Sequence, residues 1–176
     1  MATTTDHEFV QIADGTTGWG ATDRARWEQL DGILQYVRFN LYVIDNEVPT
    51  EIATQDTPVR VEYGTPQVLA VNGGMTLTAD GVRYDGNRTR VVTVNVAAAV
   101  ESVGNNQRYL FTLRKNGEPV PQLRARARLG SGGDVENVAA VGLVELEPGD
   151  VLSTWVQNEA SDNDLIVVDG SFVVQG

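Results

Sequence analysis

The hydrophobic positions of this chain first follow a helical period. Trp27 and Leu30 are three residues apart, which places them on one face of a helix. Thr22 can cap the N-terminus of such a helix, and Gly32 is placed to end it. The pattern therefore predicts one short helix between Thr22 and Gly32.

Beyond Gly32 the hydrophobic period becomes two. The odd-numbered residues from Val37 to Val43 are all apolar, whereas Arg38 and Asn40 between them are polar. Such alternation predicts a strand with one buried face. A continued helix through Phe39 is the alternative, and the β-branched and aromatic side chains favour the strand.

From residue 57 onward, short apolar or alternating runs are separated by turn residues. Asn-Gly and Asp-Gly pairs stand between the runs and supply the positive φ that tight hairpins need. No helix of three turns is expected here, so this part is predicted to be an antiparallel β-domain. The predicted strands are 59–62, 67–71, 75–78, 81–84, 90–100, 108–115, 122–129, 136–146, 151–158 and 165–175.

The composition changes near residue 56. Residues 1–56 carry ten acidic and three basic residues, and two of the three tryptophans, Trp19 and Trp27. A short acidic segment with a glycine on both sides of Trp19 is a poor candidate for an independent fold, because small segments bury too little surface. We therefore expect an N-terminal attachment arm or subdomain at 1–56 and a β-sandwich domain at 57–176.

Charge and composition argue against several kinds of partner and active site. The 176 residues include 13 Lys and Arg against 24 Asp and Glu, a net charge of −11, so free nucleic acid is not an expected partner. With no cysteine and only one histidine, His7, the chain has no thiol nucleophile, Cys-ligated zinc or two-histidine metal site. No apolar run approaches the roughly 18 residues of a membrane helix. We expect no enzymatic activity, no cofactor and no membrane partner.

Four segments carry a family resemblance. They are LFTLRKNG at 110–117, VELEPGDVL at 144–152, GSFVV at 170–174 and IATQDTPV at 52–59. In order and spacing they resemble the jelly roll shared by tumour-necrosis-factor ligands and complement-type globular heads, in the form found in many tailed-phage virion proteins. The resemblance covers roughly residues 52–176.

This resemblance implies a fold and a role. The expected fold is all-β, an antiparallel jelly-roll sandwich with an N-terminal arm that contains one short helix and a strand. The expected assembly is a homotrimer, located in the virion on the capsid exterior. There it would act as a decoration or cement protein that binds the major capsid protein or another virion protein and stabilises the shell.

Other hypotheses remain open. The main alternative is the receptor- or glycan-binding head of a phage tail or capsid fibre. A free-standing domain that binds a sugar or small molecule is a third hypothesis, and an enzyme is the fourth.

The apolar residues of the arm are the expected partner-binding residues, because aromatic anchors dominate protein interfaces. The alternative is that Trp19 and Trp27 fill a small core of the arm itself. The candidates are Phe9, Ile12, Trp19, Trp27 and Leu30.

Arg124, Arg126 and Arg128 alternate with apolar residues, so a strand places three guanidinium groups on one face. Residues 134–176 contain nine acids and no base. We therefore expect these arginines to pair with that acidic segment, within the subunit or across a subunit interface. A phosphate or glycan site is the alternative.

The acidic residues offer no specific metal or catalytic pattern. Asp162, Asp164 and Asp169 cluster with Asn163, but their spacing is not that of a calcium loop, and no metal site is predicted. Pairs of acids suited to glycoside hydrolysis occur by chance in any acidic protein, so they do not indicate an enzyme.

Overall fold

The computed structural model describes residues 36–176, except for the side chains of residues 70–72. The helix expected between Thr22 and Gly32 lies outside the described residues. A compact unit extends from Tyr36 to Gly176. In this unit no helix is long and apolar enough to cross a membrane.

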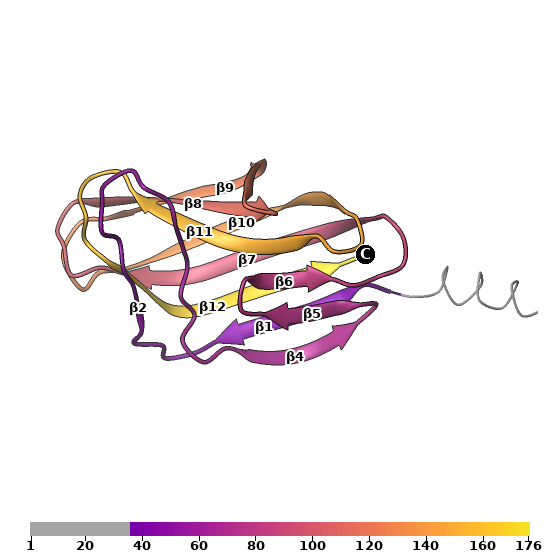
Figure 1. The fold of residues 1–176 in the computed structure, drawn as a ribbon. Coiled ribbons are helices and arrows are strands. Elements are labelled where there is room, and N and C mark those ends of the chain that lie inside the picture. Colours follow the sequence, from indigo (N-terminus) through magenta and orange to yellow (C-terminus); the bar gives the residue numbers. More distant parts are fainter. Residues whose placement is uncertain (1–35) are drawn as a thin grey trace, which may run out of the picture. The chain divides into compact units, whose positions relative to one another are not determined.

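Twelve strands form two antiparallel sheets (Figure 1). Sheet A has the order β10-β7-β12-β1-β4, with β2 paired to β12. Its strands are β1 (Arg38–Val43), β2 (Pro49–Thr50), β4 (Gln67–Asn72), β7 (Arg90–Glu101), β10 (Val135–Leu146) and β12 (Leu165–Gln175).

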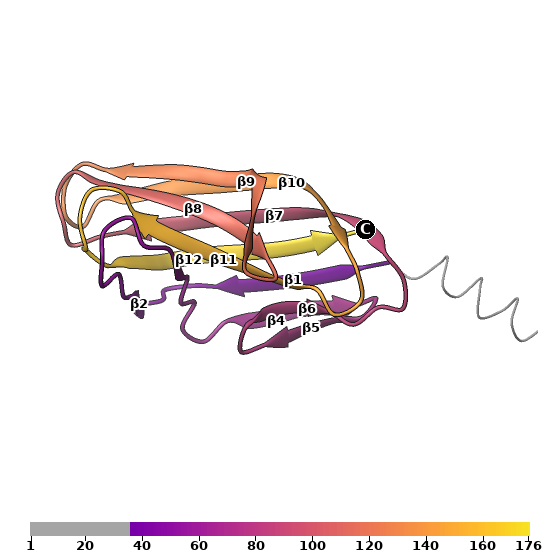
Figure 2. The same cartoon turned by 45° about the horizontal axis from the view of Figure 1, so that its top comes forward.

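Sheet B has the order β5-β6-β11-β8-β9, with β3 paired to β11. Its strands are β3 (Val59–Arg60), β5 (Met75–Thr78), β6 (Gly81–Tyr84), β8 (Gln107–Lys115), β9 (Glu118–Leu129) and β11 (Val151–Asn158). In Figure 2 the strands of the two sheets overlap, with β11 of sheet B crossing β12 of sheet A. The predicted jelly-roll sandwich is confirmed.

The predicted domain boundary at residue 56 is wrong. β1 lies between β12 and β4 in sheet A, and Phe39 is completely buried. Val37 and the last residue, Gly176, exchange two backbone hydrogen bonds of 2.7 and 3.0 Å. Residues 36–56 therefore belong to the sandwich. The acidic residues that suggested an arm lie partly in the loop after β1, where Asp45 and Glu47 are exposed.

The core fills the space between the two sheets. Around Phe39 and Phe172, whose rings meet edge to face at 6.4 Å, side chains from both sheets pack together. A second cluster surrounds Tyr109 and Ile52. Alternation along each strand explains this arrangement, because every second side chain of a strand points to the same side of its sheet.

Two of the turns that carry the family resemblance are joined by hydrogen bonds. Asn116, in the β8–β9 hairpin, donates from Nδ2 to Asp150 Oδ1 at 2.6 Å, and Lys115 Nζ lies 3.2 Å from Asp150 Oδ2. Burial by itself would raise the pKa of Asp150. Hydrogen bonds from the Glu147 N–H, Asn116 and Lys115 outweigh it and hold this pKa below its ordinary value.

Candidate functional site: two contrasting outer faces

The outer face of sheet A is uncharged along its middle, where aliphatic side chains are mixed with small polar ones. In β7, Val92 and Val94 point into the sandwich, so Thr93 and Asn95, which alternate with them, point outward. The strand pairing identifies which residues of the neighbouring strands lie on the same outward side. We define the apolar face as Asn40, Tyr42, Val91, Thr93, Asn95, Ala97, Ala99, Ala139, Val141, Leu143, Ser171 and Val173.

Three aliphatic side chains on the apolar face are well exposed. Val141 is 64% exposed, Leu143 60% and Val91 59%. Single exposed aliphatic residues are common on protein surfaces, but a contiguous group marks an interaction surface. In the described part of the chain, charged side chains lie only at its borders: Arg38 and Glu145 toward the strand ends, and Asp169 opposite Ala99.

The other end of the apolar face is hollowed by small residues. Ala97, Ala99, Ala139 and Ser171 leave an open groove of about 540 Å³, bordered by Tyr42 and Asp169. Side chains of another surface can enter such a groove, because no large side chain fills it.

The outer face of sheet B is different, because arginine dominates it. β8 and β9 pair so that Arg108 lies opposite Arg128, Leu110 opposite Arg126 and Thr112 opposite Arg124. We define the arginine face as Arg108, Arg114, Arg124, Arg126 and Arg128, all on β8 and β9 (Figure 1).

The expected pairing with the acidic C-terminal segment is present at Arg126. Its Nη2 lies 3.0 Å from Glu159 Oε1, and its Nε lies 3.2 Å from Oε2. The hydrogen bond from Arg126 lowers the pKa of the Glu159 carboxyl. Arg124 and Arg128 are exposed and form no ion pair with any residue in the described part of the chain.

Arg114 is fixed by its neighbours. Its guanidinium lies 4.5 Å from the centre of the Trp155 ring, and Nη1 donates to the Gly117 carbonyl at 3.1 Å. The indole of Trp155 in turn donates to Ser153 Oγ at 2.9 Å. This stack holds one positive charge at a defined place on the arginine face.

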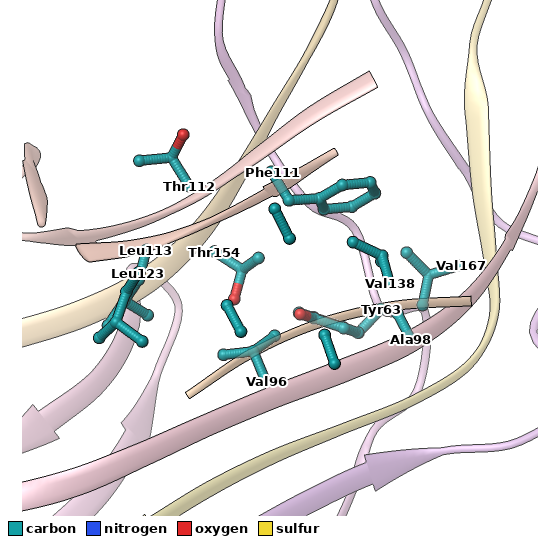
Figure 3. A pocket seen from close by; sticks show the side chains of 13 residues that line it. Tyr63, Val96, Ala98, Phe111, Thr112, Leu113, Leu123, Val138, Thr154 and Val167 are labelled. Carbon is teal, nitrogen blue, oxygen red and sulfur yellow. The ribbon is translucent and has the colours of Figure 1, made fainter. Parts of the chain in front are cut away.

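The cavity lined by Tyr63, Phe111 and Val138 between the sheets is too small for a ligand. Figure 3 shows its mostly apolar lining, with the hydroxyls of Tyr63 and Thr154 pointing toward each other. Burial raises the pKa of Tyr63 to about 12, and Thr154 offsets part of that rise. The cavity volume is about 20 Å³, which is room for one water molecule.

The acidic cluster near the C-terminus serves the fold. Asp164 Oδ1 accepts a hydrogen bond from the Ile52 N–H at 2.7 Å, and Asp169 Oδ1 accepts one from the Asp45 N–H at 3.1 Å. Residues 36–176 contain no group of three or more His, Cys, Asp or Glu side chains that could hold a metal ion.

The predicted site residues fall into two groups. Phe9, Ile12, Trp19, Trp27 and Leu30 lie outside the described residues. Arg124, Arg126 and Arg128 lie side by side on β9, as the alternation predicts.

The apolar face was not foreseen from the sequence. Its signal is the run AAVGLV at 139–144, which is apolar on both sides of β10. A strand buried on both faces has this kind of sequence.

Comparison with known proteins supports the fold. No protein-family model matches the sequence, and the search of curated proteins found no match. Murine APRIL at pH 5.0 is similar in structure, with a TM-score of 0.51, 15% identity and coverage of 77% of this chain and 98% of that one.

Two further solved structures are similar to this chain. Eiger TNF from S. frugiperda has a TM-score of 0.54 and 16% identity, and covers 81% of this chain and 93% of its own. The vertex protein P5 of PRD1 has a TM-score of 0.50 and 11% identity, with 78% and 94% covered. The resemblance to the tumour-necrosis-factor jelly roll is therefore confirmed as a resemblance of fold.

Proposed function

We propose that this chain is a trimeric structural head that decorates the outside of a phage capsid and stabilises the shell. The observation that carries the proposal is the apolar face. A protein with a net charge of −11 keeps the middle of this face free of charge and leaves Val141 and Leu143 exposed on it. Covering such a surface with another protein removes it from water.

A second copy of the chain is the proposed cover. In a closed three-fold ring each subunit offers two different surfaces, one to each neighbour. The apolar face of one subunit would lie against a different surface of the next, and the groove beside Ala97 and Ala139 would accept its side chains. Structural likeness to trimeric tumour-necrosis-factor heads supports this number of subunits.

The proposal also includes a location on the virion. The vertex protein of PRD1 has the same fold, which supports a viral structural role. Trp19 and Trp27 would attach the trimer to the major capsid protein or another virion protein, because buried tryptophans are frequent anchors of interfaces. Such a role requires no catalytic group and no cofactor, and we propose neither.

Particles assembled without this chain test the proposal. If the chain is a cement protein, these particles lose DNA or break at a lower temperature than complete particles, while they adsorb to cells normally. Particles with unchanged heat resistance and lost adsorption would refute the cement function. They would support a receptor- or glycan-binding head, which the arginine face favours as the second candidate.

A further inference from the structure

The arginine face concentrates positive charge in an acidic protein. Residues 107–129 contain six bases and one acid, whereas the whole chain has a net charge of −11. β8 and β9 place five of these bases on one outer surface. The excess of acids elsewhere could neutralise this surface, yet only Glu159 reaches it with its carboxylate in the described part of the chain.

Retaining these charges costs stability. Arg108 and Arg128 are directly opposite each other on paired strands, and like charges in that position are destabilising. Glu159, which interacts with Arg108 and Arg126, offsets part of this repulsion. Other arginines of sheet B, in contrast, have acidic partners: Arg60 pairs with Asp80 and Arg83 with Asp85. A bound polyanion would compensate the repulsion on the arginine face.

The geometry suits a linear ligand. Alternate residues of a strand are about 6.8 Å apart, so Arg124, Arg126 and Arg128 form a row of regularly spaced charges. Arg108 and Arg114 belong to the neighbouring strand, about 4.8 Å away. Guanidinium groups bind carboxylates and related oxyanions through two parallel hydrogen bonds.

We propose that the arginine face binds a linear acidic polysaccharide, one that carries carboxylate or sulfate groups. Single-stranded nucleic acid fits less well, because Arg114 already covers the half-buried Trp155 on which a base could stack. An acidic protein fits less well, because protein interfaces need an apolar centre and Leu110 between the arginines is half-buried. This inference does not depend on the proposed function, since a decoration protein and a fibre head could both bind a surface glycan.

Binding by the full-length chain tests the inference. The probes are polygalacturonate and dextran sulfate, with neutral dextran, polyglutamate and single-stranded oligothymidylate for comparison. The test variant is Arg124→Gln with Arg128→Gln, which leaves the pair of Arg126 and Glu159 intact. The matched control is Arg60→Gln with Arg83→Gln, which removes the same charge from the same sheet.

We expect the natural chain to bind both acidic polysaccharides at low salt and to release them as salt increases. The test variant should bind them roughly tenfold more weakly, whereas the control variant should change affinity by less than about twofold. Thermal melting of both variants checks that the fold is kept.

Three results would overturn the inference. The first is no binding of either polysaccharide at low salt, and the second is an equal loss of affinity in the test and control variants. The third is tighter binding of polyglutamate or oligothymidylate than of the polysaccharides, which would identify an acidic protein or a nucleic acid as the partner.

Discussion

Replacing Val141 and Leu143 by serine should dissociate the trimer without unfolding the subunit. Both side chains point out of the sandwich from β10, so the core loses no contact when they are shortened. In the proposed trimer they are covered by a neighbouring subunit. The double variant Val141→Ser with Leu143→Ser therefore separates the stability of the assembly from the stability of the fold.

The magnitude follows from the exposed fractions. Val141 is 64% and Leu143 60% exposed in the single chain. Complete burial of such a side chain contributes about 1.5–3 kcal/mol, so covering the exposed part contributes about 1–2 kcal/mol each. The double variant then costs the trimer, with six such side chains, about 6–12 kcal/mol.

This free energy translates into a measurable concentration. Each 1.4 kcal/mol changes an equilibrium constant about tenfold, so the trimer dissociation constant rises by at least about four orders of magnitude. The concentration at half dissociation varies as the square root of this constant. It should therefore increase at least about 100-fold.

Sedimentation equilibrium over a dilution series measures this shift. The natural chain should show three times its mass of 19.1 kDa, and the double variant should show the monomer mass at the same concentration. Val103→Ser is the matched control, because Val103 is 82% exposed in the loop after β7 and lies outside the apolar face. A natural chain that stays monomeric at high concentration, or a double variant that dissociates no more readily than the control, would refute the reasoning.

Three further predictions concern the fold. A chain that starts at Tyr36 should keep a cooperative thermal melt by circular dichroism. A chain that starts at Thr57 should not fold, because it lacks β1. If the Thr57 truncation folded, β1 would not be essential to sheet A. Asn158→Leu should lower the free energy of unfolding in urea by about 3 kcal/mol. It removes the 2.8 Å hydrogen bond to Gln107, whose amide oxygen keeps only the one from Ser161, and it leaves the N–H groups of Ala160 and Ser161 without their acceptor on the buried Asn158 side chain. A loss below about 1 kcal/mol would disprove this. The depressed pKa of Asp150 contributes stability that is fully present above its unfolded pKa of about 3.9 and is lost as pH falls through the lower folded pKa. Asp150→Asn should therefore reduce the loss of stability toward urea between pH 5 and pH 3. An unchanged pH profile would argue against this.

Local patterns predict the strands well, because the alternation of inward and outward side chains is a property of neighbouring residues. β1 and β6 follow their apolar alternation closely. The sequence pattern does not predict the first residues of β9, because Pro119 and Pro121 argue against a strand. β9 lies at the edge of sheet B, where a missing N–H is tolerated.

The face on which the arginines lie is likewise fixed by neighbouring residues of the chain. The alternation of Arg124, Arg126 and Arg128 places them on one face of β9 whatever the partner strand is. The strand partners and ion pairs that surround them come from other parts of the chain. Arg126 meets Glu159, 33 residues further on, and Arg108 lies opposite Arg128 through the pairing of β8 with β9.

The sequence by itself therefore determines the strands, the turns, the acidic character and the presence of three arginines on one face. Only the tertiary structure decides that β1 closes onto the C-terminal strand, and that Val141 and Leu143 share an uncharged outer surface with Val173. The reason is physical. Side-chain direction along a strand follows from the geometry of adjacent residues, whereas sheet order and the composition of a face depend on contacts between residues far apart in the chain.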